Sequence, residues 1–529
     1  MASTVDTPLG TALRAVGMPA ELGSRLELGG ERGSSAPRLE VEEFGGACVG
    51  AALLAAGRLH EARTGEWLAP SLDRGHLRAA LVSERLFRAG GEPAGAGFAP
   101  QSRFWPAADG WVRTHANYPW HHAALLKALG VADDEALGGA IASRAALEVE
   151  DAVFAAGGIA AAVRTAAEWS SDPQGAAVAA EPLVDRVRTG DADPRVRSPR
   201  GAGFPRAGAA PSPRGWFSSH TEENQPRKQA GSVPAPAAGV RVLDLTRVIA
   251  GPVCSRYLGA LGADVLRLDP PDLPDLEPGA AADSLLGKRS ASLDLRSEAA
   301  ARRLDALLDD ADVVLLGYRP GALARFGLAP DRLAARHPGL VVMELAAWGH
   351  SGPCHARRGF DSIVQAASGI AIVERGPDGR PGALPCQLLD HGTGYLAAAA
   401  VLVALADQWE TGGSHLRRLS LARTAHWLLG DGDGASVRSE RDPGVPMASS
   451  GDAAGATPTH DPPPAARPPW SESAAAFVAP VDGDPRFAAV PPPGSLDGTP
   501  LRWRGRMGRY ASDEPAWRES PRSGRSPRG

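Results

Sequence analysis

The sequence has little of several features by which protein classes are first sorted. Its 529 residues include only four cysteines and no CxxC pair, so neither a disulfide framework nor a cysteine-based metal site is predicted. No apolar run reaches the roughly 18–20 residues of a membrane span, and the longest, Tyr395–Ala406, is followed by Asp407. The N-terminal segment lacks the basic and then apolar pattern of a signal peptide, so we expect a cytoplasmic protein with no membrane partner.

Positive charge is also scarce. The formal net charge is −5, and the chain therefore lacks the basic field by which proteins bind nucleic acid. Lysine is rarer still, because Lys127, Lys228 and Lys288 are the only three among 56 basic residues. His115, His121 and His122 have no cysteine or carboxylate partners at metal-ligand spacing, so no metal is predicted.

Composition changes along the chain indicate several units, as expected for a chain of this length. We predict five segments: a flexible N-terminus (1–40), a smaller α+β domain (41–170), a linker rich in Pro, Gly and Arg (171–236), an α/β core (237–432) and a low-complexity tail (433–529). The arginines at the end of the tail favour a solvated segment over a phosphate-binding one.

Strand-like and helix-like stretches alternate within 237–432. The expected strands are Val240–Leu245, Ala263–Leu268, Val313–Leu316 and Leu340–Leu345, with helices at Pro252–Leu261 and Ser297–Leu308. This alternation predicts an open, mainly parallel, Rossmann-like α/β sheet. The N-terminal domain is expected to be mostly helical, with helices at Cys48–Ala62, His122–Leu129 and Leu147–Trp169 and a hairpin around Asp109-Gly110.

One segment of the core has a weaker echo upstream. Placing Thr64-Gly65 over Thr411-Gly412 puts Glu43 over Asp390, and an Ala/Leu-rich helix follows each carboxylate. A Ser-Leu-x-Arg stretch recurs downstream of both. We favour a duplication over chance similarity between two alanine-rich helices.

The strongest local motif is the stretch VLDLTRVIAGP at 242–252, in which a strand runs through small residues into a helix. Free backbone N–H groups at such a helix start can meet an anionic or polar ligand. No GxGxxG follows the strand, which disfavours nicotinamide and flavin cofactors. From the residues alone, this is a ligand site of unspecified chemistry.

With the motifs that follow it, this stretch resembles the opening of the family III CoA-transferases, a superfamily that includes α-methylacyl-CoA racemases. The further motifs, in the family's order, are GKRS with LDL (287–295), YRPG with RFG (318–327), WGHSGP (348–353), GFD (359–361) and Leu389-Asp390. The resemblance covers about 195 residues. It implies an open α/β fold that forms interlocked dimers in ordinary members, so a homodimer and an intrachain pseudo-dimer both stay open.

The resemblance also implies a reaction and a nucleophile. CoA passes from an acyl-CoA to a carboxylic acid through an aspartyl-CoA thioester, and Asp390 matches the nucleophile. The residues agree, because Asp390 directly precedes a helix whose dipole favours an ionised carboxylate, and Gly392 and Gly394 leave room for a thioester. Without the resemblance, a helix N-cap is the simpler interpretation of Asp390.

The resemblance supplies candidate CoA contacts. They are Val248, Ile249 and Ala250 along the pantetheine, Lys288 and Arg325 near the phosphates, Tyr318 beside the adenine and Trp348 near the thioester. For the two cations, surface solvation is the alternative. Pro270-Pro271 stands where some members have a phosphate-binding arginine, which could weaken CoA binding. CoA and acyl-CoA are expected as substrates, with no permanently bound cofactor.

Two alternative activities follow from departures from the pattern. Racemases carry His-Asp where this chain has Phe360-Asp361, and phenylalanine cannot move a proton. An acyl-CoA racemase or epimerase is therefore disfavoured, and His391 is a poor substitute base because it points away from Asp390 on the helix. The resemblance implies that the core and nucleophile helix come first and a smaller domain follows, whereas here a nucleophile-helix-like segment (41–90) and a small-domain-like segment (94–170) precede the core. This order, with Pro270-Pro271 and the low-complexity segments, leaves a catalytically degenerate CoA-binding protein as the other alternative.

Overall fold

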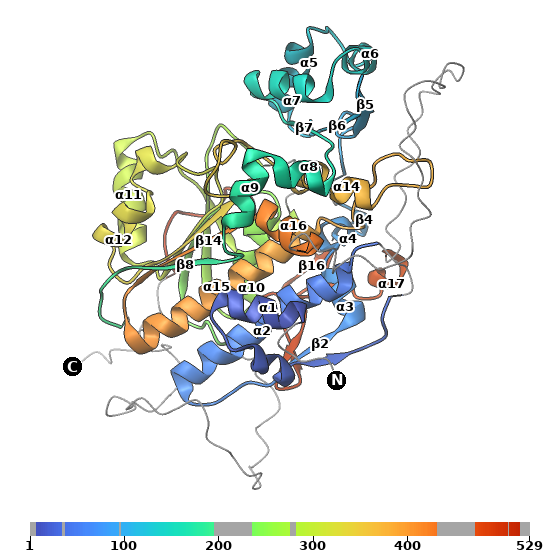
Figure 1. The fold of residues 1–529 in the computed structure, drawn as a ribbon. Coiled ribbons are helices and arrows are strands. Elements are labelled where there is room, and N and C mark those ends of the chain that lie inside the picture. The colour runs from blue at the N-terminus through green and yellow to red at the C-terminus, as the bar shows by residue number, and fades with distance from the viewer. Residues whose placement is uncertain are drawn as a thin grey trace, which may run out of the picture.

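A seven-stranded sheet forms the centre of the protein (Figure 1). The computed structural model describes residues 7–33, 38–94, 97–194, 235–275, 282–430, 471–505 and 507–518. In sheet order, the strands are β11 (Arg289–Ser292), β10 (Asp264–Asp269), β9 (Arg241–Leu245), β12 (Val313–Leu316), β13 (Val341–Ala346), β14 (Ser414–Ser420) and β8 (Asp185–Gly190). All neighbours pair in parallel except β14 and β8. The predicted mainly parallel α/β core is confirmed.

The two faces of the sheet carry alternate residues of each strand. Val242 of β9 belongs to the hydrophobic core shared with α10 (Ala250–Ala260) and α15 (Leu388–Thr411). Its neighbour Leu243 belongs to the core shared with α11 (Glu298–Asp309) and α12 (Pro330–Arg336). Apolar residues at consecutive positions are what a strand covered by helices on both faces requires.

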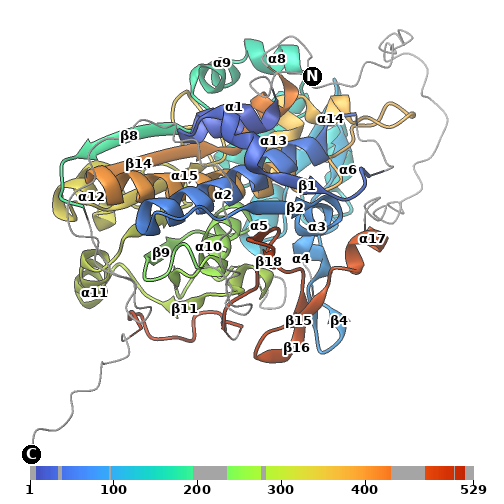
Figure 2. The same cartoon turned by 90° about the horizontal axis from the view of Figure 1, so that it is seen from below.

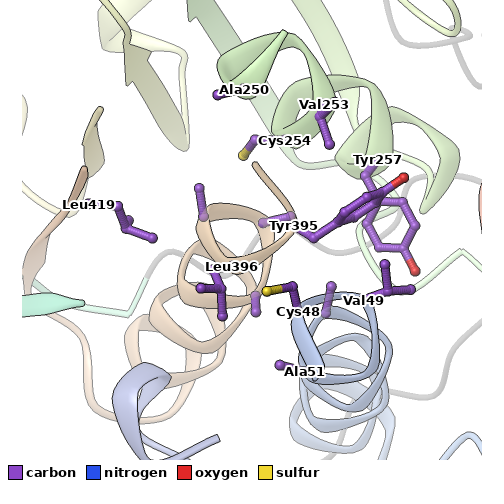
Figure 3. Close-up of a cluster of buried hydrophobic side chains, with 14 of the residues drawn as sticks. Cys48, Val49, Ala51, Ala250, Val253, Cys254, Tyr257, Tyr395, Leu396 and Leu419 are labelled. Carbon is purple, nitrogen blue, oxygen red and sulfur yellow. The ribbon is translucent and has the colours of Figure 1, made fainter. Parts of the chain in front are cut away.

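Helix α15 is the most apolar helix of the core. By length and hydropathy it could cross a membrane, but the whole of its apolar stretch is buried inside the protein. Helix α2 (Val41–Thr64) lies along one side of it and α10 along another (Figures 2 and 3). Tyr395 of α15 meets Tyr257 of α10 edge to face, with ring centroids 5.3 Å apart. Val49, Leu53 and Leu54 of α2 are fully buried, as the pairing of the two units predicts.

The structure supports the duplication. Helices α2 and α15 both have 24 residues, and the spacing that separates Thr64 from Thr411 also separates Val41 from Leu388. A short strand and a capped helix follow in each copy: β2 (Pro70–Asp73) and α3 (Arg74–Ala80), then β14 and α16 (Leu421–Leu429). The cap residues Asp73 and Ser420 also correspond. The N-terminal unit therefore shares one continuous hydrophobic core with α10 and α15 within the chain.

A small domain with its own apolar core stands at the top of Figure 1. It comprises β5 (Phe104–Pro106), β6 (Trp111–Thr114), α5 (Pro119–Leu129), α6 (Leu137–Ala142), α7 (Ala146–Ala155) and β7 (Ala160–Ala162). The predicted hairpin is confirmed, because β5 and β6 pair antiparallel. The helix predicted over Leu147–Trp169 is wrong: α7 ends before Gly157, whose φ of 85° is left-handed, and α8 (Ala166–Ser171) begins only after β7.

Three segments expected to be irregular contain regular structure. The predicted N-terminus 1–40 holds α1 (Pro8–Val16), a short 3-10 turn (Ala20–Arg25) and β1 (Glu27–Gly29), and the predicted linker 171–236 begins with α9 (Pro173–Ala180) and β8. The predicted tail 433–529 holds α17 (Ser471–Ala475), β15 (Ala479–Val481), β16 (Asp484–Ala489), β17 (Ser495–Leu496) and β18 (Thr499–Pro500). These strands join the N-terminal unit, because β16 pairs with β3 (Arg88–Ala89), itself paired with β4 (Glu92–Pro93), and β17 pairs with β2. The rest of the predicted linker and tail, at 195–234, 431–470 and 519–529, lies outside the described residues.

Candidate active site

A cleft of about 520 Å³ opens at the carboxyl ends of the parallel strands. Strands β9 and β12 are neighbours in the sheet, and the order of the chain reverses between them, which is where open α/β sheets bind ligands. Arg247 follows β9, while Tyr318 and Arg319 follow β12, and all three line the cleft. Tyr118 of the small domain closes it, since its hydroxyl donates to Asp275 Oδ1 of the core at 2.8 Å.

A buried polar network fixes the turn from β9 into α10. Asp244 accepts hydrogen bonds from Thr246, from Ser255 Oγ at 2.6 Å and from Lys288 Nζ at 3.1 Å. The side chains of Lys288 and Asp244 are fully buried. Contrary to the prediction, Lys288 therefore does not line the cleft. Burial lowers its pKa to about 8, and its role in this structure is to hold the loop that borders the cleft.

The next residues of this loop are strained. Val248 lines the cleft and has a φ of +68°, a region that β-branched residues adopt only under constraint. Ile249 is half-buried, and Ala250 begins α10. Gly251 is required beside them, because a Cβ there would lie 2.2 Å from Thr246 Cβ. The predicted pantetheine stretch is thus a constrained edge of the cleft, reached directly by Val248.

Arginine side chains surround the cleft. Arg319, Arg325 and Arg358 have no ion-pair partner among the described residues, and all three line the cleft. Arg247 differs, because its guanidinium lies 3.8 Å from Asp275. Arg325 was predicted from sequence, whereas Arg319 and Arg358 were missed. The signal for Arg319 was its place directly after Tyr318 in the YRPG motif.

The two predicted aromatic contacts lie in different places. Tyr318 lines the cleft, and burial raises the pKa of its hydroxyl to about 12. Trp348 is buried outside the cleft, where its indole donates to the Arg358 carbonyl at 3.0 Å. Trp348 therefore supports the cleft wall that carries Arg358, and its predicted place near the thioester stays a prediction.

The small domain adds aromatic rings that the sequence did not reveal as neighbours. The ring of His115 stacks on Phe360, with centroids 3.8 Å apart and planes 9° apart. His121, Tyr118 and Phe360 line the cleft together. Burial lowers the pKa of His115 to about 3 and that of His121 to about 4, so both imidazoles are neutral at pH 7. No short-range signal could have joined segments so far apart in the chain.

Asp390 lies in the first turn of α15 and is 6% exposed. It is not among the residues that line the cleft. Its backbone N–H donates to Asp361 Oδ2 at 2.9 Å, and the preceding residue, Phe360, is a cleft residue. Burial raises the pKa of Asp390 well above its usual range, and the charges of Asp361 and Glu84 raise it further.

The glycines after Asp390 have a different role from the one predicted. A Cβ on Gly394 would lie 2.5 Å from the Ala250 carbonyl oxygen, and one on Gly392 would lie 3.4 Å from Cys48 Sγ. The space beside both glycines is therefore filled by α10 and α2. They allow close helix packing and do not make room for a thioester.

Glu43, the counterpart of Asp390 in the N-terminal copy, is held by cations. Its carboxylate lies 2.7 Å from Arg32 and 3.5 Å from Arg74. Neither arginine lines the cleft. The expectation that Glu43 stays away from the candidate site agrees with this placement.

Comparison with known proteins finds similarity over one segment of the chain. Residues 237–461 match CoA-transferase family III. Similar proteins include the probable fatty acyl-CoA transferase Rv3272 of Mycobacterium tuberculosis, 38% identical over 34% of this chain and 48% of that protein. The succinyl-CoA–L-malate CoA-transferase beta subunit of Chloroflexus aurantiacus is 36% identical over 34% and 47%, and the formyl-CoA:oxalate CoA-transferase of Streptomyces coelicolor 34% identical over 33% and 45%. The resemblance predicted from the motifs is confirmed for this segment.

The chain spans about half the length of these curated relatives. Among solved structures, one of the Mycobacterium tuberculosis protein Rv3272 is 35% identical over 36% of this chain and 56% of that chain, with a TM-score of 0.33.

Proposed function

Because residues 237–461 match CoA-transferase family III, we propose that this protein moves CoA from an acyl-CoA thioester to a carboxylic acid. The observation that carries the proposal is the site itself. An arginine-lined cleft lies at the switch point of the sheet, and a buried carboxylate, Asp390, stands next to its wall at Phe360-Asp361. Such a cleft suits a long polyanionic ligand whose thioester must leave water to react.

The proposed reaction begins with attack by Asp390. Its carboxylate oxygen adds to the thioester carbonyl carbon, the C–S bond breaks, and a mixed anhydride and CoA thiolate result. The thiolate then attacks the aspartyl carbonyl and releases the original acyl group as a carboxylate. An acceptor carboxylate repeats the two steps in reverse on the aspartyl-CoA thioester, and Asp390 is regenerated.

The raised pKa of Asp390 is compatible with this sequence of steps. A carboxylate kept out of water is a stronger nucleophile once it is ionised, because no hydration shell has to be removed. The cost is that a larger fraction of the empty enzyme holds Asp390 protonated at a given pH. We expect the rate of transfer to rise with pH as Asp390 loses its proton.

Trapping the intermediate tests the proposal. After incubation with acyl-CoA donors of different chain length and polarity, borohydride or hydroxylamine treatment should leave a mass change on the peptide that contains Asp390. New acyl-CoA species should appear by mass spectrometry when a second acid is added. Labelling at another residue, together with full activity of Asp390→Ala, would falsify the proposal. Tight CoA binding without turnover across the panel would instead favour the degenerate alternative.

The cleft arginines are expected to bind the phosphates of CoA. Hydrogen bonds to charged groups contribute about 1.5–3 kcal/mol, so Arg319→Ala should raise the KM for acyl-CoA roughly 10-fold to 100-fold with a smaller change in kcat. Arg302→Ala is the matched control, because Arg302 lies on the exposed side of α11, where it pairs with Glu298. Equal KM values for the two variants would contradict this assignment.

Two observations bear on the racemase alternative. Phe360 is stacked against His115 and offers no proton-transfer group. His391 is fully buried and hydrogen-bonded to Glu84, so it does not face the cleft. Both favour transfer of CoA. We further propose that the chain works in the cytoplasm as an intrachain pseudo-dimer, since α2 packs on α15 as a second copy of it.

A further inference from the structure

Three consecutive residues of the N-terminal unit contact the surroundings of Asp390, and one of them contacts its helix directly. They belong to α4 (Ser83–Leu86). Ser83 bonds to Arg256 of α10, with Oγ 2.9 Å from Nη2. Glu84 Oε2 lies 3.0 Å from His391 Nε2, and Arg85 donates to the Pro385 carbonyl at 3.2 Å. A single turn of the duplicated unit therefore contacts α10, the first turn of α15 and the loop before it.

The central contact is buried on both sides. His391 is fully buried and Glu84 is 9% exposed. Arg85 Nε lies 3.4 Å from the other oxygen of Glu84, and His391 directly follows Asp390 in the helix. Burying an acid this deeply is costly unless the acid is paired. The negative charge of Glu84 also affects the ionisation of the nucleophile, Asp390.

We propose that Glu84 is a positioning residue for the CoA transfer proposed above, which orients His391 in the first turn of α15 and sets the charge balance around Asp390 from the N-terminal unit. The duplicated unit thus completes the active site, although its own carboxylate, Glu43, is paired with arginines elsewhere. Of the measurements that test this role, only the activity assay rests on the proposed function.

The charges around Asp390 agree with this role. Asp361 of α13 (Asp361–Ser368) and Glu84 are the charged groups that raise its pKa, after burial itself. Hydrogen bonding to His391 lowers the pKa of Glu84 despite its burial, so Glu84 stays ionised. Three further charged groups surround the contact: Arg85 lies beside Glu84, and Arg256 bonds to Ser83 and pairs with Asp283. Five other titratable groups around the first turns of α15 are neutral at pH 7, because burial raises the pKa of each. These are Cys48, Cys254, Tyr257, Cys386 and Tyr395.

The sign of the effect follows from these charges. Asp390 must be ionised to attack, and a negative charge at Glu84 makes its ionisation harder. Glu84→Gln keeps the shape and the hydrogen bond but removes the charge, so the pKa of Asp390 should fall. The acid limb of the kcat/KM profile should then move to lower pH than in the wild-type protein. Glu84→Asp keeps the charge and should leave that limb nearer its original position.

A second readout needs no substrate. The carboxylic-acid C=O band of Asp390, isolated by infrared difference against Asp390→Asn, should vanish at lower pH in Glu84→Gln than in the full-length wild-type protein. This separates the inference from the proposed function, because the band titrates whether or not CoA is transferred. A merely structural Glu84 would lower kcat or the melting temperature and leave both pH profiles unmoved, which would overturn the proposal.

Failure to fold is also informative. If Glu84→Gln does not fold, Glu84→Met replaces the charge with an apolar chain of similar length, and the same two titrations apply. If Glu84→Asp folds and neither uncharged variant does, the charge is needed for folding alone, and the role at Asp390 is overturned.

Discussion

Replacing Asp390 with alanine is expected to lower the rate of CoA transfer by at least about 10³-fold, because loss of a covalent nucleophile removes the pathway and leaves only binding and orientation. The fold should survive. The side chain of Asp390 has no hydrogen bond or ion pair within the described part of the chain, so its removal leaves no partner unsatisfied there. Removing it costs little packing, so the melting temperature should change by a few degrees at most.

Glu43→Gln is the matched control for this variant. Glu43 occupies the corresponding turn of α2 and is also a carboxylate at the start of a 24-residue helix. Its partners are Arg32 and Arg74, so the variant should keep most of the activity and lose only a partly exposed ion pair worth roughly 0–1 kcal/mol. Steady-state transfer assays on both purified variants test whether Asp390 and Glu43 differ in function. Similar losses of activity in the two would mean that the copies are not functionally distinct.

Local sequence patterns predicted the core well because its strands are continuously apolar and the ends of its long helices are marked. Residues 313–316 form an uninterrupted apolar strand between helices, and the structure places β12 at Val313–Leu316. The Thr-Gly pairs at 64–65 and 411–412 mark the ends of α2 and α15. A left-handed residue such as Gly65, with a φ of 80°, ends a helix in a way that sequence alone reveals.

Among the elements that sequence analysis missed, β8 has no apolar pattern of its own. Strand β8 lies at the edge of the sheet and is half-exposed or exposed along its length, so it shows no apolar alternation. Its position comes from pairing with β14, far away in the chain. A short edge strand of this kind is indistinguishable by composition from a linker.

The site residues also divide into those that local motifs predict and those that only long-range packing brings together. Asp390, Tyr318 and Arg325 lie in motifs whose position after a strand or at a helix start is readable from sequence. Lys288 was not placed correctly, because burial of a lysine depends on a partner such as Asp244, 44 residues away. Glu84 and His391 are 307 residues apart, and only the packing of the two units brings them together.

The isolated core, residues 237–432, is expected to be insoluble or unfolded, and inactive. Removing α2 would expose the apolar side of α15, where Cys48 and Val49 now pack (Figure 3). It would also remove Glu84 from the buried His391 and β8 from the edge of the sheet. An exposed apolar helix face and an open strand edge both favour aggregation.

Co-expression provides the control for this truncation. Residues 1–194 supplied as a separate chain alongside 235–529 should restore a soluble complex, because the contacts seen between the described residues of the two units would be regained. Size-exclusion chromatography and the transfer assay measure the two effects. A soluble, cooperatively unfolding and fully active 237–432 fragment would show that the N-terminal unit is dispensable. It would also remove the structural reason for the duplication, since neither α2 nor Glu84 would then be needed to complete the site.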